Sequence, residues 1–499
     1  MPQPLRFLRR PRQAPATLPA DADAGMAAAR ARTAPRPGIV WIELTSRCPY
    51  DCPFCSRRTL RGNGVNMNFE LYSKLIAQLD RPAIIRLNYS GESVHHPRIV
   101  DAVRLAAATR AWVELVSVPA ALTAARLAAI VAAGLNRLTI SLHTLDPARY
   151  DAIYRFGTLD RLLAGVREAA ALRGSSRHPF VVDLAFVAMA RNLQELPTIA
   201  TLAQDLGIPV LAVHPLIRRS EIDERFAAEV DAGGQVTPSF SAALAAALAA
   251  ARSAAPGVAI QVSAPDPHAP AADPGTRIVE WATALPAGLA VHSCDQDPFD
   301  TLHILADGTV VTCEVRDGIP VGNVATATLD EIWHGSALAG FRAGFAAARD
   351  AACAQCAYRK VHRPAPLAAR ITPADNTAQL LRGWHATEDG LVWSRRDALL
   401  VLARTPRARS LALRGMLPPG PEGGNTLTVF IDDAASAVIT NASAAVLSVD
   451  ARIALPPARA GVGEAGVRLT VAHAHSPPCG RRVDTRELGF ALLAAEIAR

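Results

Sequence analysis

The chain has 499 residues, half of them hydrophobic, which is enough for about three domains with substantial cores. Its net charge is +7, but much of the excess lies in the first 37 residues, so the composition does not indicate a nucleic-acid-binding surface. No apolar run reaches the length of a membrane span. Seven of the eight cysteines fall into ligand-like groups, which indicates metal binding and a reducing, cytoplasmic location rather than disulfide bonds.

Residues 1–37 are rich in proline, alanine and arginine and contain no sustained apolar stretch of the kind a secretory signal needs. This composition predicts a disordered basic tail, because it offers too little apolar surface to bury. An arginine-rich targeting peptide is the alternative interpretation.

Three cysteines lie within eight residues, just after the first strand-like run of the chain. Residues 39–44 are apolar and β-rich, which predicts a strand. The cysteines that follow, spaced C-x3-C-x2-C, are Cys48, Cys52 and Cys55. Three thiolates at a strand end can hold three irons of a four-iron cluster and leave the fourth iron open to a substrate. A structural zinc site is the alternative, and it would need His95 or His96 as a nearby fourth ligand.

From residue 38 to about 220, strand-like and helix-like runs alternate, which predicts a parallel sheet covered by helices. The predicted strands are residues 39–44, 83–88, 112–117, 137–142, 180–188 and 210–214. Helical spacing predicts helices at residues 69–79, 97–109 and 123–133. Six such units predict a partial TIM-like (β/α)6 barrel. A doubly wound sheet is the alternative, weakened because no G-x-G-x-x-G follows the first strand.

Polar residues follow several of the predicted strands at the point where each strand ends. Ser90-Gly91-Glu92 follows the second strand, Ser117 closes the third, Ser141 the fourth and His214 the sixth. Because functional groups of a barrel gather at the carboxyl ends of its strands, we expect these residues to lie near the cysteine loop.

The cysteine spacing, with the aromatic residue Phe54 before the last cysteine, resembles the pattern of the radical SAM superfamily. The resemblance implies that Cys48, Cys52 and Cys55 bind a [4Fe-4S] cluster whose open iron chelates S-adenosylmethionine. It implies reductive cleavage to a 5′-deoxyadenosyl radical that abstracts hydrogen from a substrate. An electron donor such as flavodoxin or ferredoxin is then an expected partner.

The resemblance also implies residues that bind the cofactor. Ser90-Gly91-Glu92 is similar to the family's Gly-Gly-Glu motif, with Ser in place of the first Gly, and would hold the amino group of the methionine moiety. A plain tight turn is the alternative. Ser141 matches a family position near the ribose, and Arg155 resembles a basic residue that meets the methionine carboxylate. Residues 117–120 depart from the family's Asn-Gly after the third strand.

A second group of four cysteines follows a predicted connector at residues 221–290, which holds an alanine-rich helical run and a proline-rich stretch. These cysteines, called here the second cysteine set, are Cys294, Cys313, Cys353 and Cys356. Four thiols in two groups suit either tetrahedral zinc or one four-iron cluster, and the spacing alone favours zinc.

Residues 291–363 resemble the SPASM region that follows the radical SAM core in many peptide- and protein-modifying enzymes. The resemblance lies in the Gly-x4-Cys spacing ending at Cys313, the Gly322-Asn323-Val324 turn and the Leu-x-x-Ile-Trp run ending at Trp333. Full SPASM regions carry seven cysteines and two clusters, whereas this chain has no further thiol between Cys356 and Cys479. The resemblance therefore implies one auxiliary [4Fe-4S] cluster, fully ligated by the second cysteine set.

After a linker at residues 364–382, short alternating runs separated by Gly, Pro and Asp predict an all-β, sandwich-like domain at residues 383–499. Strands are expected within residues 398–402, 410–413, 427–431 and 467–471. The two ends of this region resemble a small β-sandwich appended to some bacterial surface-glycan enzymes. Trp384 and Trp393 could form a sugar-stacking face, or they could belong to the core.

Together these features predict a radical SAM enzyme with a SPASM-like domain that acts on a peptide or protein. A glycan or sugar nucleotide is the alternative substrate. A zinc-stapled binding protein without turnover is the alternative of another class.

Overall fold

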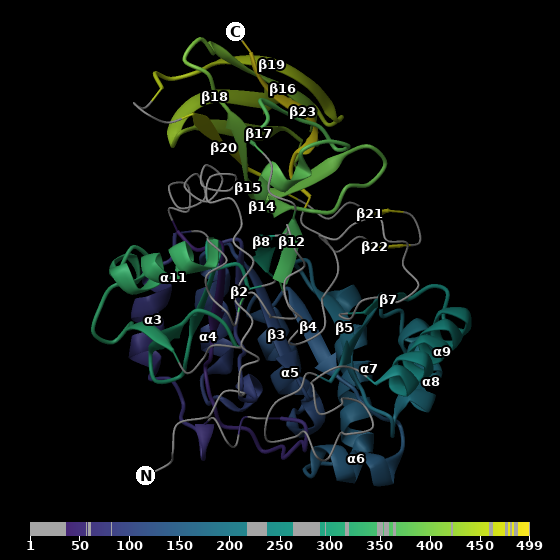
Figure 1. Ribbon diagram of the computed structural model, residues 1–499. Coiled ribbons are helices and arrows are strands. Elements are labelled where there is room, and N and C mark those ends of the chain that lie inside the picture. The colour runs from purple at the N-terminus through teal and green to yellow at the C-terminus, as the bar shows by residue number, and fades with distance from the viewer. Residues whose placement is uncertain are drawn as a thin grey trace.

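The computed structural model describes residues 36–55, 57, 61–80, 82–216, 237–262, 290–294, 296–314, 319–346, 353, 359–362, 366–420, 423–458, 463–474, 478–479, 482–483 and 488–498. Figure 1 shows two bodies, an α/β body formed by the first part of the chain and an all-β domain formed by the last part. In the described part of the chain, no helix combines the length and hydrophobicity needed to cross a membrane.

A ten-stranded sheet forms the frame of the α/β body, in the order β11-β10-β9-β1-β2-β3-β4-β5-β6-β7. Its central strands are β1 (Ile39–Ile42), β2 (Ile84–Arg86), β3 (Trp112–Ser117), β4 (Arg137–Ser141), β5 (Val181–Ala188) and β6 (Val210–Pro215). Neighbours among these six pair in parallel. The predicted partial barrel is confirmed, and every predicted strand boundary lies within two residues of the observed one.

Helices cover the outer side of this sheet (Figure 1). They are α3 (Phe69–Ala77), α4 (Ile99–Ala108), α5 (Ala124–Ala132), α6 (Pro147–Tyr154), α7 (Leu159–Ser175) and α8 (Leu196–Asp205). The side chain of Asn68 caps α3 by accepting from the backbone N–H groups of Glu70 and Leu71. Apolar residues at helical spacing face the sheet, so strands and helices share one core.

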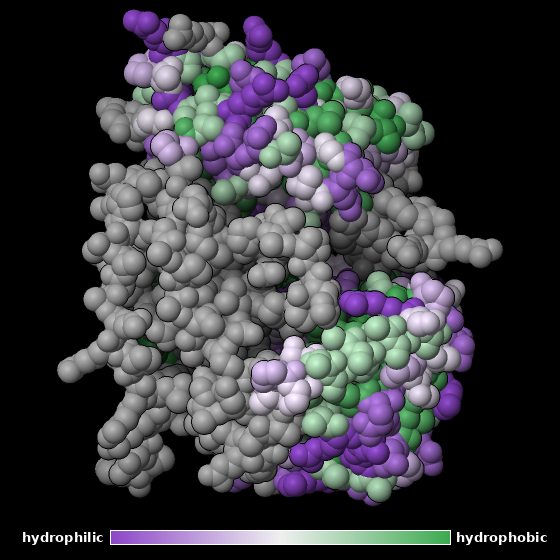
Figure 2. All heavy atoms as spheres, turned by 45° about the vertical axis from the view of Figure 1, so that its right-hand side comes forward, coloured by the Kyte–Doolittle hydropathy of each residue, from purple (hydrophilic) through white to green (hydrophobic). Residues whose placement is uncertain are grey.

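The sheet extends beyond both edges of the predicted barrel. At one edge, β7 (Ala259–Val262) pairs in parallel with β6, and α9 (Pro238–Ala254) packs against α8. Part of the predicted connector therefore continues the α/β body. Figure 2 brings α8 and α9 forward, and pale green residues are prominent there, as expected for the exposed alanines of α9.

At the other edge, the region of the second cysteine set joins the same sheet. β9 (Thr301–Ile304) pairs in parallel with β1, and β10 (Thr309–Val311) and β11 (Pro320–Asn323) follow as antiparallel strands. The remaining elements here are β8 (Ala290–Cys294), β12 (Arg359–His362), α10 (Leu329–Trp333) and α11 (Ser336–Ala346). The barrel and this region are thus hydrogen-bonded into one sheet, although the sequence suggests two separate units.

The last part of the chain is antiparallel β-structure, as predicted. Its main strands are β14 (Leu380–Trp384), β15 (Val392–Ala403), β16 (Ser410–Leu417), β17 (Asn425–Ile431), β18 (Ala434–Asn441), β19 (Leu447–Ala454), β20 (Glu464–Val471) and β23 (Ala491–Ala498). β15 is long: its first residues pair with β23 and its later residues with β20. It thereby joins two halves of a nearly barrel-like sheet around a separate apolar core. Trp384 packs against that core and its indole N–H donates to the Leu399 carbonyl, so this tryptophan is structural.

An ion pair between Arg382 and Asp300 links the all-β domain to the end of the α/β sheet where β1 begins. Arg382 Nη1 lies 3.1 Å from Asp300 Oδ1, and its Nη2 lies 2.7 Å from Asp397 Oδ1. The Asp300 carbonyl in turn accepts from the N–H groups of Gly38 and Ile39. The all-β domain therefore lies at the opposite end of β1 from the cysteine loop (Figure 1).

Candidate active site

The cysteine loop, residues 48–55, leaves the carboxyl end of β1 and is held in place by backbone hydrogen bonds. The Ser46 N–H donates to the Val65 carbonyl, and the Asp51 N–H donates to the Tyr154 carbonyl at the end of α6. A further bond, from the Cys55 N–H to the Cys52 carbonyl, closes a turn within the loop. Cys48 and Cys52 are half-buried and Cys55 is exposed, so all three predicted ligands lie on one short, anchored segment.

Burial changes the acid–base properties of two of these thiols. Burial raises the pKa of Cys48 to about 12, and the nearby Glu92 carboxylate adds to the effect. Burial also raises the pKa of Cys52. Both thiols are therefore protonated at neutral pH until a metal displaces their protons.

The zinc alternative for this loop loses one of its candidate fourth ligands. His96 is buried, its Nδ1 accepts from the Arg98 N–H, and its Nε2 lies 3.3 Å from the Met67 carbonyl oxygen. Both ring nitrogens are thus already engaged.

Ser90-Gly91-Glu92, called here the SGE turn, lies directly against the start of the cysteine loop. The Glu92 N–H donates to the Arg47 carbonyl, one residue before Cys48. A Cβ at Gly91 would lie 2.0 Å from the Thr45 carbonyl oxygen, so only glycine allows this close approach of two backbones. Two motifs separated by more than thirty residues are therefore adjacent, as predicted from their positions after neighbouring strands.

The carboxyl group of Glu92 is buried, with only 5% of the residue exposed, and one of its oxygens lacks a protein donor. Oε2 accepts from the Val118 N–H at 2.9 Å, whereas Oε1 has no hydrogen-bond partner among the described residues. Burial raises the pKa of Glu92 to about 7. A buried acceptor without a donor fits the ammonium group of an amino acid, which needs acceptors for three N–H bonds. The residues present thus fit the amino end of S-adenosylmethionine.

The other predicted cofactor residues lie around the same strand ends, with contacts of their own. The N–H and hydroxyl of Ser90 both donate to Glu43, so that hydroxyl already has a protein acceptor. Ser141 is half-buried at the end of β4, and its carbonyl accepts from the Tyr154 hydroxyl. Arg155 Nη1 lies 3.1 Å from Asp51 Oδ2, which ties this arginine to the cysteine loop. The roles of Ser141 and Arg155 toward a cofactor stay predictions.

An aromatic group packs beside the cysteine loop, and Phe54 is its only member among the predicted cofactor-binding residues. The Phe54 ring meets the His143 ring edge-on at 5.4 Å between centroids, and His143 stacks on Tyr154. The hydroxyl of Tyr50 donates to the Val118 carbonyl. Burial lowers the pKa of His143 to about 3, so this imidazole is neutral. Tyr150 and Tyr154 are four residues apart in the sequence, so they could have been predicted to lie on the same face of one helix.

Cys313 of the second cysteine set lies toward the end of the sheet opposite the cysteine loop. Cys294 ends β8 and lies opposite Arg359 of β12, three residues beyond Cys356. Cys313 lies two residues after β10. Because β10 runs antiparallel to β9, it ends at the same end of the sheet at which β9 begins. Cys294 and Cys353 both pack against the main core. Cys356 lies outside the described residues, so whether the four thiols meet stays a prediction.

The Leu-x-x-Ile-Trp run that precedes Cys353 forms the helix α10. The Thr328 hydroxyl and the Glu331 side chain form a capping box that begins α10. Trp333, at the end of that helix, is fully buried, and the Arg342 guanidinium lies 3.9 Å from its ring centroid. The Leu329 N–H donates to the Gln78 side chain next to α3, which ties this helix to the barrel.

Comparison with protein-family models identifies both cysteine regions. The model of the radical SAM superfamily matches residues 42–203, and a model of an iron–sulfur cluster-binding domain, SPASM, matches residues 294–357. The region that carries the cysteine loop, residues 42–203, therefore belongs to the radical SAM superfamily. Membership implies a [4Fe-4S] cluster and S-adenosylmethionine for this enzyme, and the SPASM match implies auxiliary iron–sulfur binding.

Among individual proteins, this radical SAM enzyme is similar to peptide cyclases and to GTP cyclases. The PqqA peptide cyclase of Ruegeria pomeroyi is 28% identical over 333 residues, which cover 62% of this chain and 77% of the relative. The GTP 3′,8-cyclase 1 of Pseudomonas aeruginosa is 31% identical over 173 residues, 34% of this chain and about half (51%) of the relative. Among solved structures, Streptococcus suis SuiB bound to S-adenosylmethionine is 11% identical, with a TM-score of 0.46, and the match covers 62% of this chain and 68% of that one.

Proposed function

We propose that this radical SAM enzyme modifies a peptide or protein substrate. The observation that carries the proposal is the match to a PqqA peptide cyclase over 333 residues. That match is longer than the superfamily match at residues 42–203, so the similarity reaches beyond the barrel core. The SPASM match at residues 294–357 adds the auxiliary region that, by resemblance, follows the core in many peptide- and protein-modifying enzymes.

In this proposal, Cys48, Cys52 and Cys55 hold the core cluster. The bound cluster and S-adenosylmethionine supply one-electron cleavage of a sulfonium bond, which starts hydrogen abstraction from the substrate. The chain contributes an anchored loop for the thiols and the Glu92 carboxylate for the ammonium group. Flavodoxin or ferredoxin is the proposed electron donor.

The second cysteine set is proposed to hold one auxiliary [4Fe-4S] cluster with all four irons ligated. Such a closed cluster has no open iron for a substrate, so it would carry electrons or brace the domain. The barrel at residues 38–220 then supplies the radical chemistry, and residues 291–363 the auxiliary site. The β-domain at residues 383–499 is attached away from the cysteine loop, so we assign it no part in the radical step.

The substrate class can be tested with the anaerobically reconstituted enzyme and a reductant. A short peptide encoded beside the gene, incubated with S-adenosylmethionine, should change in mass while 5′-deoxyadenosine forms. The variant with alanine at positions 48, 52 and 55 is the matched control and should form neither product. Turnover of a sugar nucleotide, with every candidate peptide left unchanged, would favour the glycan alternative.

The role of Glu92 can be tested separately from the substrate. Glu92→Gln removes a charge-assisted hydrogen bond worth about 1.5–3 kcal/mol. The affinity for S-adenosylmethionine, measured by titration calorimetry, should fall on the order of tenfold to a hundredfold. Iron content should stay unchanged, because the proposed cluster ligands are the three cysteines and not Glu92. If Glu92→Gln binds S-adenosylmethionine as tightly as the wild type, the SGE turn has a structural role only.

A further inference from the structure

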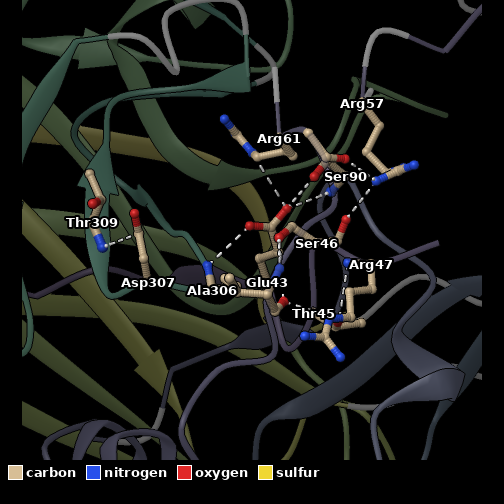
Figure 3. A network of polar contacts seen from close by, with 12 residues as sticks. Glu43, Thr45, Ser46, Arg47, Arg57, Arg61, Ser90, Ala306, Asp307 and Thr309 are labelled. Atoms are coloured by element: carbon tan, nitrogen blue, oxygen red, sulfur yellow. Dashed lines mark hydrogen bonds and ion pairs between the residues drawn. The ribbon is translucent and has the colours of Figure 1, made fainter. Parts of the chain in front are cut away.

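Glu43 is a buried carboxylate that joins two segments far apart in the sequence (Figure 3). It is the first residue after β1, and only 1% of it is exposed. Its Oε1 accepts from the N–H of Ser90 at 3.2 Å and from the Ser90 hydroxyl. Its Oε2 accepts from the N–H of Ala306 at 3.0 Å. The Nε of Arg61 lies 3.8 Å from Oε1 and supplies a compensating positive charge.

The two oxygens serve two different turns. Ser90 opens the SGE turn, whereas Ala306 opens the turn between β9 and β10, in which Asp307 Oδ1 accepts from the Thr309 N–H. Because both oxygens accept from backbone N–H groups, only a carboxylate satisfies both. A glutamine would direct its NH2 group at one of these donors whichever way it turned.

The SGE turn is thus held on two sides. On one side the Arg47 carbonyl accepts from the Glu92 N–H, and on the other side Glu43 accepts from Ser90. Both acceptors lie on the segment between β1 and the cysteine loop, and Gly91 leaves no gap against that segment. The position of the Glu92 carboxylate relative to the thiols therefore depends on Glu43.

We infer that Glu43 is a positioning residue for S-adenosylmethionine, one that also couples the cofactor turn to the β9–β10 turn of the auxiliary region. The inference rests on the proposed role of Glu92 as the acceptor for the ammonium group. Binding groups must be held to within a fraction of an ångström to work, so loosening the turn weakens binding without touching the cofactor. Coupling through one carboxylate is reciprocal: cofactor binding must also stabilise the β9–β10 turn.

A matched control exists on a neighbouring loop. Glu195 is another mostly buried carboxylate that accepts from a hydroxyl and a backbone N–H, those of Thr144 and Leu145. Its bonds are of the same kind, but they hold the loop after β4 and not the SGE turn. Glu43→Gln and Glu195→Gln should therefore both lower the melting temperature, while only the first should affect the cofactor.

The experiment uses the full chain, reconstituted anaerobically, in four forms: wild type, Glu43→Gln, Glu195→Gln and Glu92→Gln. Titration calorimetry should show that Glu43→Gln weakens S-adenosylmethionine binding on the order of tenfold, with iron content unchanged. Glu195→Gln should bind like the wild type. Hydrogen exchange should be faster in Glu43→Gln at both the SGE turn and the β9–β10 turn, and in the wild type S-adenosylmethionine should slow exchange at both.

The outcomes separate the inference from the function on which it rests. Normal binding by Glu43→Gln together with weak binding by Glu92→Gln would overturn the inference and leave the proposed function standing. Normal binding by Glu92→Gln would overturn the role of the SGE turn itself, and the inference with it. If Glu43→Gln does not fold, Ser90→Ala decides, because it removes one donor to Glu43: about threefold weaker binding supports the inference, and unchanged affinity overturns it.

Discussion

The two cysteine regions of this enzyme are built in different ways. Cys48, Cys52 and Cys55 lie on one short loop after β1, which contains a turn of its own and is anchored to α6 by a backbone hydrogen bond from Asp51 to Tyr154. The second cysteine set is spread over more than sixty residues of the sequence: Cys294 ends β8, Cys313 follows β10 by two residues, and the other two cysteines precede β12 in the chain. The first site is therefore largely local in origin, whereas the second exists only if distant strands pair correctly.

The described strands of the two regions also place Cys48 and Cys313 toward opposite ends of the sheet. The cysteine loop follows the carboxyl end of β1, while β9 begins beside Ile39 at the other end of that strand. The four residues of β1 alone span roughly 13 Å. An open cluster at one end and a closed one at the other would serve different tasks, so removing each should have a different consequence.

The largest expected effect comes from replacing Cys48, Cys52 and Cys55 by alanine. Reductive cleavage of S-adenosylmethionine should be abolished, and about half of the iron should be lost, because one of two proposed clusters disappears. The melting temperature should change little, since a local loop carries this site. Formation of 5′-deoxyadenosine and iron content are the measurements, and persistent cleavage would contradict the assignment.

Replacing Cys353 and Cys356 by alanine in that triple variant should remove the remaining iron and its brown colour. Because these thiols connect segments that are distant in sequence, the melting temperature or solubility should fall as well. Iron, zinc and sulfide analysis of the parent triple variant completes the comparison. One zinc per chain and no colour in that parent would show that the second cysteine set is a structural zinc site.

A smaller effect is expected for the ion pairs on the strands between the two ends. Arg86 Nε lies 2.7 Å from Glu114 Oε2, and Arg137 Nη1 lies 3.4 Å from Glu114 Oε1. Burial alone would raise the pKa of Glu114, but these two arginines outweigh it and hold the pKa below its usual value. Glu114→Gln should lower the free energy of unfolding by about 3 kcal/mol at neutral pH.

The pH dependence of that loss follows from the direction of the shift. A carboxyl whose pKa is lowered on folding stabilises the protein above its unfolded pKa, and the stabilisation disappears as the pH falls through the folded pKa. Denaturant unfolding of the wild type and Glu114→Gln should therefore differ at pH 7 and converge below pH 4.5, the usual carboxyl value. A difference that stays constant down to pH 3 would show that the loss arises from packing.

The sequence by itself determined the strands of the barrel, the cysteine loop and the SGE turn. Alternating apolar runs such as residues 112–117 encode strands locally, and cysteine spacing within eight residues needs no tertiary contact to be recognised. The carboxyl ends of neighbouring parallel strands must lie together, which is why Glu92 could be predicted to lie near Cys48.

Only the tertiary structure decided which side chains share a contact across the sheet. No spacing relates Glu43 to Ala306, because β9 comes more than 250 residues after β1 and lies beside it only in the folded sheet. The same holds for Arg155, whose side chain pairs with Asp51, and for His143, which meets Phe54 edge-on and stacks on Tyr154. Long-range pairing depends on the free energy of the whole packed sheet, so local sequence patterns do not encode it.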